Sequence, residues 1–194
     1  MYEYIRGIVV FLTPTYAVVE AAGVGYRLEL SMQSYGALRP DMEVKLYVHQ
    51  VLREDSNVFF GFVTEAERSL FRQLITVSGV GPSSARMLLS AYASGELCDL
   101  INSGDDASIR RVKGIGQKTS QRIVLDLQGK VGTGEVQGLG AGVMQGVGIR
   151  EEALSALVTL GFNRGASEKV VDKVLGRGGV PSVEQLIKAS LKEL

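Results

Sequence analysis

The feature that most restricts the fold of this chain is a short glycine pattern that occurs twice. Residues 74–85 align with residues 109–120 at an offset of 35, which matches Gly79-Val80-Gly81 with Gly114-Ile115-Gly116. In both copies an apolar segment precedes the glycines, and a polar segment suited to begin a helix follows them. Glycines permit backbone angles that side chains forbid, and they let the main chain approach another molecule closely. The repeat therefore predicts two successive units of helix, glycine hairpin and helix.

The chemistry of such a hairpin suits a phosphate group. The helix that follows each hairpin presents unpaired N–H groups and the positive end of its dipole. We expect the central residues Val80 and Ile115 to anchor the hairpins in the core. A lone Gly-X-Gly is more often a simple tight turn, but two copies in register, with cations just after the second, favour a DNA-binding role. The expected DNA-binding residues are Gly79, Val80, Gly81, Ser83, Ser84, Gly114, Ile115, Gly116, Lys118, Thr119 and Arg122.

The charge distribution is compatible with this interpretation. The net charge is zero, but Arg110, Arg111, Lys113, Lys118 and Arg122 fall close together, and a phosphate senses charges within a Debye length of ~8 Å. Backbone N–H groups read no bases, so binding should be sequence-independent and salt-sensitive. A nucleotide-binding loop fits less well, because no strand precedes either glycine pair and the Rossmann and Walker spacings are missing from the sequence.

Residues 1–64 are expected to form an OB-like β-barrel. Alternating or β-branched segments predict strands near residues 5–12, 17–20, 26–30, 44–48 and 58–62, with a turn at Gly23-Val24-Gly25. An SH3-like barrel would give much the same pattern, so the type of barrel stays open at this point.

The remaining segments predict helices. A capping box at Thr64 and Glu67 should open an all-α domain over residues 65–130. Residues 131–148 are predicted to be a flexible linker, since residues 129–148 hold eight glycines and two charges. Residues 149–194 have the apolar spacing of a three-helix (UBA-like) domain, with a second capping box at Ser182 and Gln185. The fold class is multidomain α+β.

Several function classes find little support in the composition. The single cysteine, Cys98, excludes an intramolecular disulfide and predicts a buried thiol. No apolar run approaches the ~20 residues of a membrane helix, and the N-terminus does not resemble a secretory signal, so we expect a cytoplasmic protein. His49, the only histidine, has no evident nucleophile or ligand partners. We therefore expect no catalytic residue, no metal site and no cofactor.

Nearly the whole chain resembles the RuvA family, the Holliday-junction-binding subunits of the bacterial branch-migration machinery. The resemblance rests on motifs that occur in the family's order and spacing: Arg6-Gly7-Ile8, Gly23-Val24-Gly25-Tyr26, Arg53-Glu54-Asp55, Phe60-Gly61-Phe62, Gly79-Val80-Gly81-Pro82 and Gly114-Ile115-Gly116-Gln117-Lys118-Thr119. Each hairpin alone is shared by many DNA-repair proteins, but the set is specific. It implies a barrel, tandem helix–hairpin–helix motifs, a variable linker and a mobile three-helix domain.

The resemblance also implies partners and roles. Members of this family act in recombination, repair and the SOS response as non-catalytic homotetramers, with one or two tetramers on each four-way junction. Their partners are the RuvB motor ATPase and the RuvC resolvase. Glu54 and Asp55, otherwise ordinary solvated turn residues, would be an acidic pin that repels phosphates at the tetramer centre. Some of four apolar residues of the third domain would contact the motor, namely Leu157, Leu160, Phe162 and Leu191.

Two positions depart from the family pattern. Members often carry a lysine where this chain has Ser83, and a basic residue where it has Tyr4. Each difference removes a positive charge. We therefore expect the first hairpin to bind DNA more weakly than in such members.

Two other functions stay open. A helix–hairpin–helix glycosylase or nuclease would need a catalytic Asp or Lys, or a cluster of metal-binding carboxylates. A single-strand-binding barrel would need aromatic platforms. The candidates for such platforms are equally well explained as barrel core: Tyr26, Tyr47, Phe59, Phe60 and Phe62.

Overall fold

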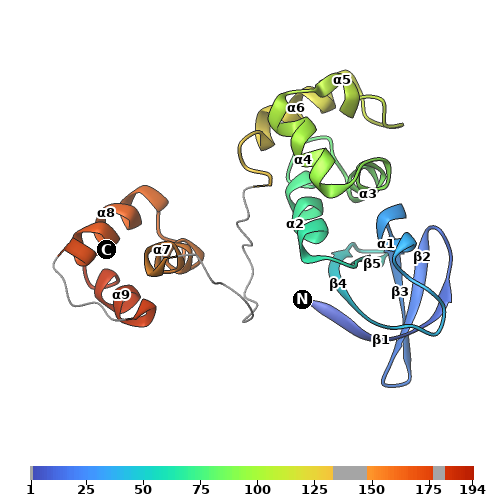
Figure 1. Cartoon of the computed structure of the whole chain (residues 1–194), viewed down its shortest axis with the longest axis horizontal. Coiled ribbons are helices and arrows are strands. Elements are labelled where there is room, and N and C mark those ends of the chain that lie inside the picture. Colours follow the sequence, from blue (N-terminus) through green and yellow to red (C-terminus); the bar gives the residue numbers. More distant parts are fainter. Residues whose placement is uncertain (1, 133–147, 177–181) are drawn as a thin grey trace. The chain divides into compact units, whose positions relative to one another are not determined.

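Residues 2–132, 148–176 and 182–194 are described by a computed structural model (Figure 1). The chain divides into two compact units, Met1–Val136 and Gln137–Leu194. Most of the predicted linker, residues 133–147, lies outside the described residues. Val131, at its start, is buried against the helical core, and its carbonyl accepts a hydrogen bond from the Asn102 side chain at 3.1 Å.

Five strands close a β-barrel at the start of the first unit. They are β1 (Tyr4–Leu12), β2 (Tyr16–Ala21), β3 (Val24–Leu30), β4 (Glu43–Leu52) and β5 (Asn57–Phe62), and α1 (Met32–Gly36) lies between β3 and β4. The order around the barrel is β1-β2-β3-β5-β4, with β3 and β5 parallel and the other neighbours antiparallel. This arrangement is OB-like, which decides between the two barrel types.

The alternation of side chains along the strands explains the barrel core. Val44, Leu46 and Val48 on β4 are buried, whereas Glu43 before them and Lys45 between the first two face solvent. Apolar residues at every second position can all point to one face of a strand. All five predicted strands are confirmed.

The predicted turn between β2 and β3 shares Gly23 with the observed turn but begins one residue late and ends two residues late. The turn residues are Ala22 and Gly23, with φ of +50° and +78°, while Val24 and Gly25 already pair with Ala21 and Glu20. Two consecutive positive φ values suit the twist of a tight hairpin. Alanine seldom adopts a positive φ. The sequence pattern therefore favoured Gly23 and Gly25 as turn residues over Ala22.

Five helices follow the barrel in the described part of the first unit. They are α2 (Glu65–Leu74), α3 (Pro82–Ala91), α4 (Ser94–Ser103), α5 (Asp106–Ile109) and α6 (Gln117–Leu127). Their core continues into the barrel, because Phe60 and Phe62 of β5 pack on Phe71 of α2 with ring centroids 5.1 and 4.9 Å apart. The barrel therefore supports the helices that carry the glycine hairpins.

The capping box at the start of α2 is only half confirmed. The Thr64 hydroxyl accepts a hydrogen bond from the Glu67 amide at 3.2 Å. The Glu67 carboxylate does not accept the hydrogen bond from the Thr64 amide that would complete the box. It is 3 % exposed and accepts hydrogen bonds from the hydroxyls of Ser31 and Ser34, the latter at 2.7 Å. The expectation for the carboxylate is wrong because α1 packs there and supplies nearer donors.

The second unit is the expected three-helix module. It contains α7 (Ile149–Thr159), α8 (Arg164–Gly176) and α9 (Val183–Ser190). Its core includes Ala153, Val171 and Leu186, and the Ser182 hydroxyl caps α9 by accepting from the Gln185 amide at 3.3 Å. No helix within the described ranges is long and apolar enough to cross a membrane.

Candidate nucleic-acid interface

The first glycine hairpin joins α2 to α3. Gly79 adopts a φ of +92°, a left-handed angle that strongly favours glycine. The amide of Val80 then donates to the Val77 carbonyl at 3.0 Å, and the Val80 side chain is 5 % exposed. Gly81 is the extended N-cap residue of α3 and has no side chain to cap the helix. The valine thus anchors the loop, as predicted.

The second hairpin, between α5 and α6, repeats this geometry. Gly114 has a φ of +90°. The Ile115 amide donates to the Val112 carbonyl at 3.0 Å, and the Ile115 side chain is again 5 % exposed. Gly116 is the uncapped N-cap of α6. Two loops with the same backbone conformation confirm that the sequence repeat is a structural repeat.

Each hairpin leaves a group of backbone donors unpaired. The first helical amides to find an acceptor are those of Ala85 in α3 and Thr119 in α6, which donate to the carbonyls of Gly81 and Gly116. Within the described part of the chain, the preceding amides form no hydrogen bond: those of Gly81, Ser83 and Ser84, and those of Gly116, Gln117 and Lys118. Except for half-buried Ser84, these residues are exposed. Such donors at a helix N-terminus suit a phosphate oxygen.

The two hairpins lie next to each other. The Arg122 guanidinium on α6 donates to the Ser78 hydroxyl of the first hairpin at 3.2 Å. The Thr119 hydroxyl lies 3.6 Å from the position that a Cβ atom on Gly79 would occupy. The unpaired amides of both loops therefore belong to one neighbourhood.

The predicted basic cluster flanks the second hairpin in the sequence. Arg110, Arg111, Lys113, Lys118 and Arg122 are all exposed. No ion pair joins any of them to another side chain of the described residues. Their positive charges are thus available to an anionic partner.

Glu54 and Asp55 lie in the exposed connection between β4 and β5. The amide of Arg53 donates to the Ser56 carbonyl at 2.8 Å and closes this turn. The two carboxylates are adjacent and solvated, which suits either an ordinary turn or the acidic pin.

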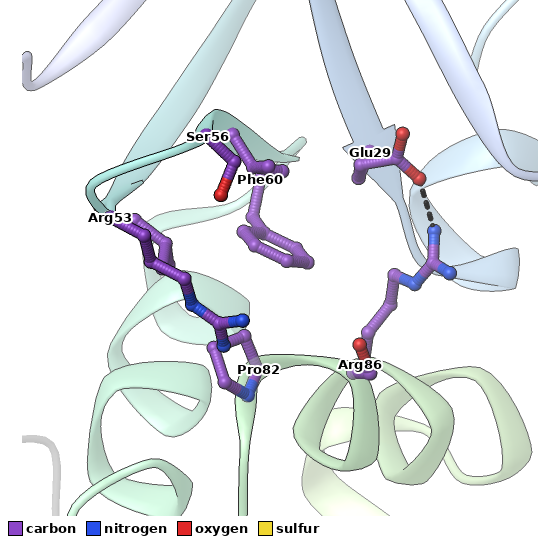
Figure 2. A pocket seen from close by; sticks show the side chains of 9 residues that line it. Glu29, Arg53, Ser56, Phe60, Pro82 and Arg86 are labelled. Carbon is purple, nitrogen blue, oxygen red and sulfur yellow. Dashed lines mark hydrogen bonds and ion pairs between the residues drawn. The ribbon is translucent and has the colours of Figure 1, made fainter.

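A cavity of about 230 Å³ lies between the base of this turn and the start of α3. Figure 2 shows Arg86 on one side of it, paired with Glu29 at 2.6 Å, and Arg53 reaching across toward Pro82 on the other. Ser83 also lines it. In the sequence, Arg53 stands out only as part of the motif Arg53-Glu54-Asp55, and no local pattern places it beside the first hairpin.

The described ranges contain no group of three or more His, Cys, Asp or Glu side chains placed to hold a metal ion. Burial first, and then the charges of Arg72 and Arg68, lower the pKa of His49, whose ring packs 5.3 Å from that of Phe71. Burial, and then the charge of Asp99, raise the pKa of the half-buried Cys98 thiol.

The candidate platforms for single strands are core residues. Phe60 and Phe62 are buried, and Tyr26, Tyr47 and Phe59 are half-buried against the two cores of the first unit. Stacking of bases needs open ring faces. These five rings therefore favour the core interpretation over a single-strand site.

The residues expected to contact a motor protein divide into two groups. Leu157 is fully buried in the core of the second unit, so it offers no surface to a partner, and its place in the predicted patch is wrong. Leu160, Phe162 and Leu191 are 60, 36 and 40 % exposed. They follow the ends of α7 and α9, where a helical core no longer covers them.

A closed OB-like barrel that carries two neighbouring glycine hairpins with unpaired amides defines a tandem helix–hairpin–helix protein. Comparison with known families agrees. Residues 1–61 match the RuvA N-terminal domain, residues 71–129 a SAM-like helix-hairpin-helix tandem, and residues 148–194 the RuvA C-terminal domain. The chain belongs to the RuvA family.

Curated relatives cover the full length. Proteins named Holliday junction branch migration complex subunit RuvA from Porphyromonas gingivalis, Christiangramia forsetii and Parabacteroides distasonis are 42, 44 and 43 % identical to the chain. In each alignment, 100 % of both chains is covered. The similarity therefore extends over the barrel, the hairpins and the C-terminal module together.

Proposed function

We propose that this protein binds four-way junction DNA without sequence preference, holds the junction open and recruits the RuvB motor ATPase for branch migration in recombination and repair. The observation that carries the proposal is the pair of neighbouring hairpins with unpaired, exposed amides. The names of the full-length relatives, subunits of a Holliday junction branch migration complex, support it. The protein itself is non-catalytic in this proposal, and it acts in the cytoplasm.

In the proposed complex, backbone amides of the protein bind the phosphates of the DNA, and no contact reads the bases. Phosphate oxygens would accept hydrogen bonds from the unpaired amides at the starts of α3 and α6. Lys118 and Arg122 would add charge, and Ser83, Ser84 and Thr119 would add hydroxyl donors. Because such contacts read only the backbone of DNA, affinity should fall steeply with salt.

Preference for a branched target would come from a homotetramer. A single pair of hairpins binds duplex weakly, but four pairs in one assembly gain from effective concentration only when four arms radiate suitably. The outer face of β1 supports self-association, since Tyr4, Ile8, Val10 and Phe11 are 46–53 % exposed. A β-bulge near Val10 turns two successive apolar side chains outward, and exposed apolar groups of this kind mark interaction surfaces.

Glu54 and Asp55 would act by repulsion where the strands meet. A carboxylate about 6 Å from a phosphate is repelled by roughly 3 kcal/mol at an effective dielectric constant of ~20, before screening. Four subunits would place eight such groups at the centre of the junction. The exposed apolar residues of the C-terminal module, Leu160, Phe162 and Leu191, would contact the motor, and the RuvC resolvase would join the complex.

The test is competition between junction and linear duplex of equal length at equal salt. We expect the junction to win by a large factor, and the same factor for junctions of unrelated sequence. Displacement of the junction by duplex at comparable concentration would refute the mechanism.

Incubation of labelled junction with the protein and Mg²⁺ should leave the DNA intact, whereas cleavage would favour a nuclease. Preferential binding of single strands would favour an OB-type single-strand module.

A further inference from the structure

The two hairpins are alike in backbone but not in charge. Lys118 is the second residue after Gly116, and the offset of 35 places Ser83 at the matching position of the first hairpin. Arg122 is matched in the same way by Met87. The first hairpin therefore carries neither cation in its own sequence; the Arg122 guanidinium of α6 reaches only its Ser78 hydroxyl, on the side that faces the second hairpin.

The nearest cation on α3 does not make up the difference. Arg86 donates to the Glu29 carboxylate at 2.6 Å and to the Thr15 carbonyl at 3.1 Å. Its side chain is only 25 % exposed. A guanidinium held by a carboxylate on the barrel is largely neutralised and cannot turn to a phosphate without breaking that pair.

Arg53 stands in a different position. It comes from the β4–β5 connection, lines the same cavity as Ser83, and reaches toward Pro82 at the first turn of α3 (Figure 2). It is exposed, and in the ranges that the structure describes its side chain has no hydrogen bond or ion pair, even though Glu54 and Asp55 follow it directly. An unpaired guanidinium in the cavity that Ser83 lines, where the Ser83 amide is itself unpaired, supplies the charged donor of a phosphate site.

We propose that Arg53, supplied by the barrel, is a phosphate-binding cation at the start of α3 and takes there the role proposed for Lys118 at the start of α6. This proposal rests on the proposed function and adds a binding residue to it. It also divides the β4–β5 connection into two parts. Arg53 would attract the DNA phosphates at the first hairpin, while Glu54 and Asp55, further along the connection, would repel them.

The test is a double-mutant cycle on the full-length protein with a four-way junction. Arg53→Gln should weaken binding about eightfold per lost contact near 0.1 M salt and lower the salt slope by about 0.9 per contact. Arg53→Lys should keep most of the affinity. Ser83→Lys should strengthen the Arg53→Gln variant by a larger factor than it strengthens the wild type, because a lysine there would replace the missing charge.

Controls separate this proposal from its alternatives. Arg39→Gln removes another exposed barrel arginine that does not line the cavity, and it should leave binding and its salt slope unchanged. Equal thermal unfolding of all variants excludes a folding effect. The proposal is overturned if Ser83→Lys raises junction affinity by the same factor with and without Arg53. It is also overturned if Arg53→Gln binds the junction as tightly as the wild type. A Lys118→Glu variant that also binds normally would overturn the proposed function itself.

Discussion

Replacing each of the two glycines of one hairpin by alanine should have different effects: one variant should lose stability, and the other should lose DNA affinity. Gly114 has a φ of +90°, and an added Cβ would meet nothing within 4 Å. The cost of Gly114→Ala is therefore backbone strain alone, about 1–2 kcal/mol of unfolding free energy. Alanine's stiffer unfolded chain does not compensate, because the folded angle is incompatible with it.

Gly116 offers the matched comparison. Its φ is −82°, which any residue adopts, and a Cβ there also meets nothing within 4 Å. The poorer N-cap preference of alanine and its stiffer unfolded chain nearly cancel, so Gly116→Ala should change stability by less than about 0.5 kcal/mol. The added methyl group would, however, stand beside the amides of Gln117 and Lys118. Loss of one charge-assisted hydrogen bond there should weaken junction binding at least about tenfold.

The assay combines urea unfolding followed by circular dichroism with junction titration at fixed salt and fixed protein concentration. Gly114→Ala should lose mainly stability, and Gly116→Ala mainly affinity. Wild-type affinity in a stable Gly116→Ala protein would refute the reasoning, because the phosphate would then not approach this loop. Gly79→Ala and Gly81→Ala should repeat the contrast in the first hairpin, since Gly79 has a φ of +92° and Gly81 of −87°.

Three further predictions follow from the same geometry. Lys118→Glu should weaken junction and duplex binding alike and flatten the salt slope by about 0.9 per lost contact; fluorescence anisotropy at several salt concentrations checks this, and an unchanged slope would contradict it. Glu54→Gln combined with Asp55→Asn should leave junction affinity equal or higher, and a large loss in the same assay would argue against repulsion. Glu67→Ala should cost about 2–4 kcal/mol of stability, because two buried serine hydroxyls lose their acceptor, whereas Glu67→Gln should keep an acceptor. Burial raises the pKa of Glu67 above its ordinary value of 4.5 in the folded state. The stability linked to its protonation is therefore fully present below the unfolded pKa and is lost as pH rises through the folded pKa. Urea unfolding across pH should show Glu67→Gln gaining on the wild type as pH rises, and a constant difference would contradict this assignment.

The hairpins and most of the strands could be predicted because their causes are local. Gly79 and Gly114 are needed where the backbone is left-handed. The alternation of Val44, Leu46 and Val48 follows from the two-residue period of a strand. Thr64 caps α2 through an amide three residues away. In each case the interacting groups are close in the sequence, so a short segment contains the whole argument.

Other features were out of reach because their partners are distant in the chain. The Glu67 carboxylate binds Ser31, 36 residues earlier, so its capping role was misassigned. Leu157 has the same helical spacing as exposed apolar residues, and only packing shows that it is core. The five-residue helix α1 has too few residues to show a period.

The sequence by itself therefore determined the repeat, the barrel and the three-helix module, and through its motifs the RuvA family. Tertiary structure alone decided which charges stand beside which hairpin. Arg122 meets Ser78 across 44 residues, and Arg53 comes from another domain to the cavity that Ser83 lines. The physical reason is that backbone conformation depends on neighbours in the chain, whereas the field at a phosphate site depends on every charge that folding brings within a Debye length.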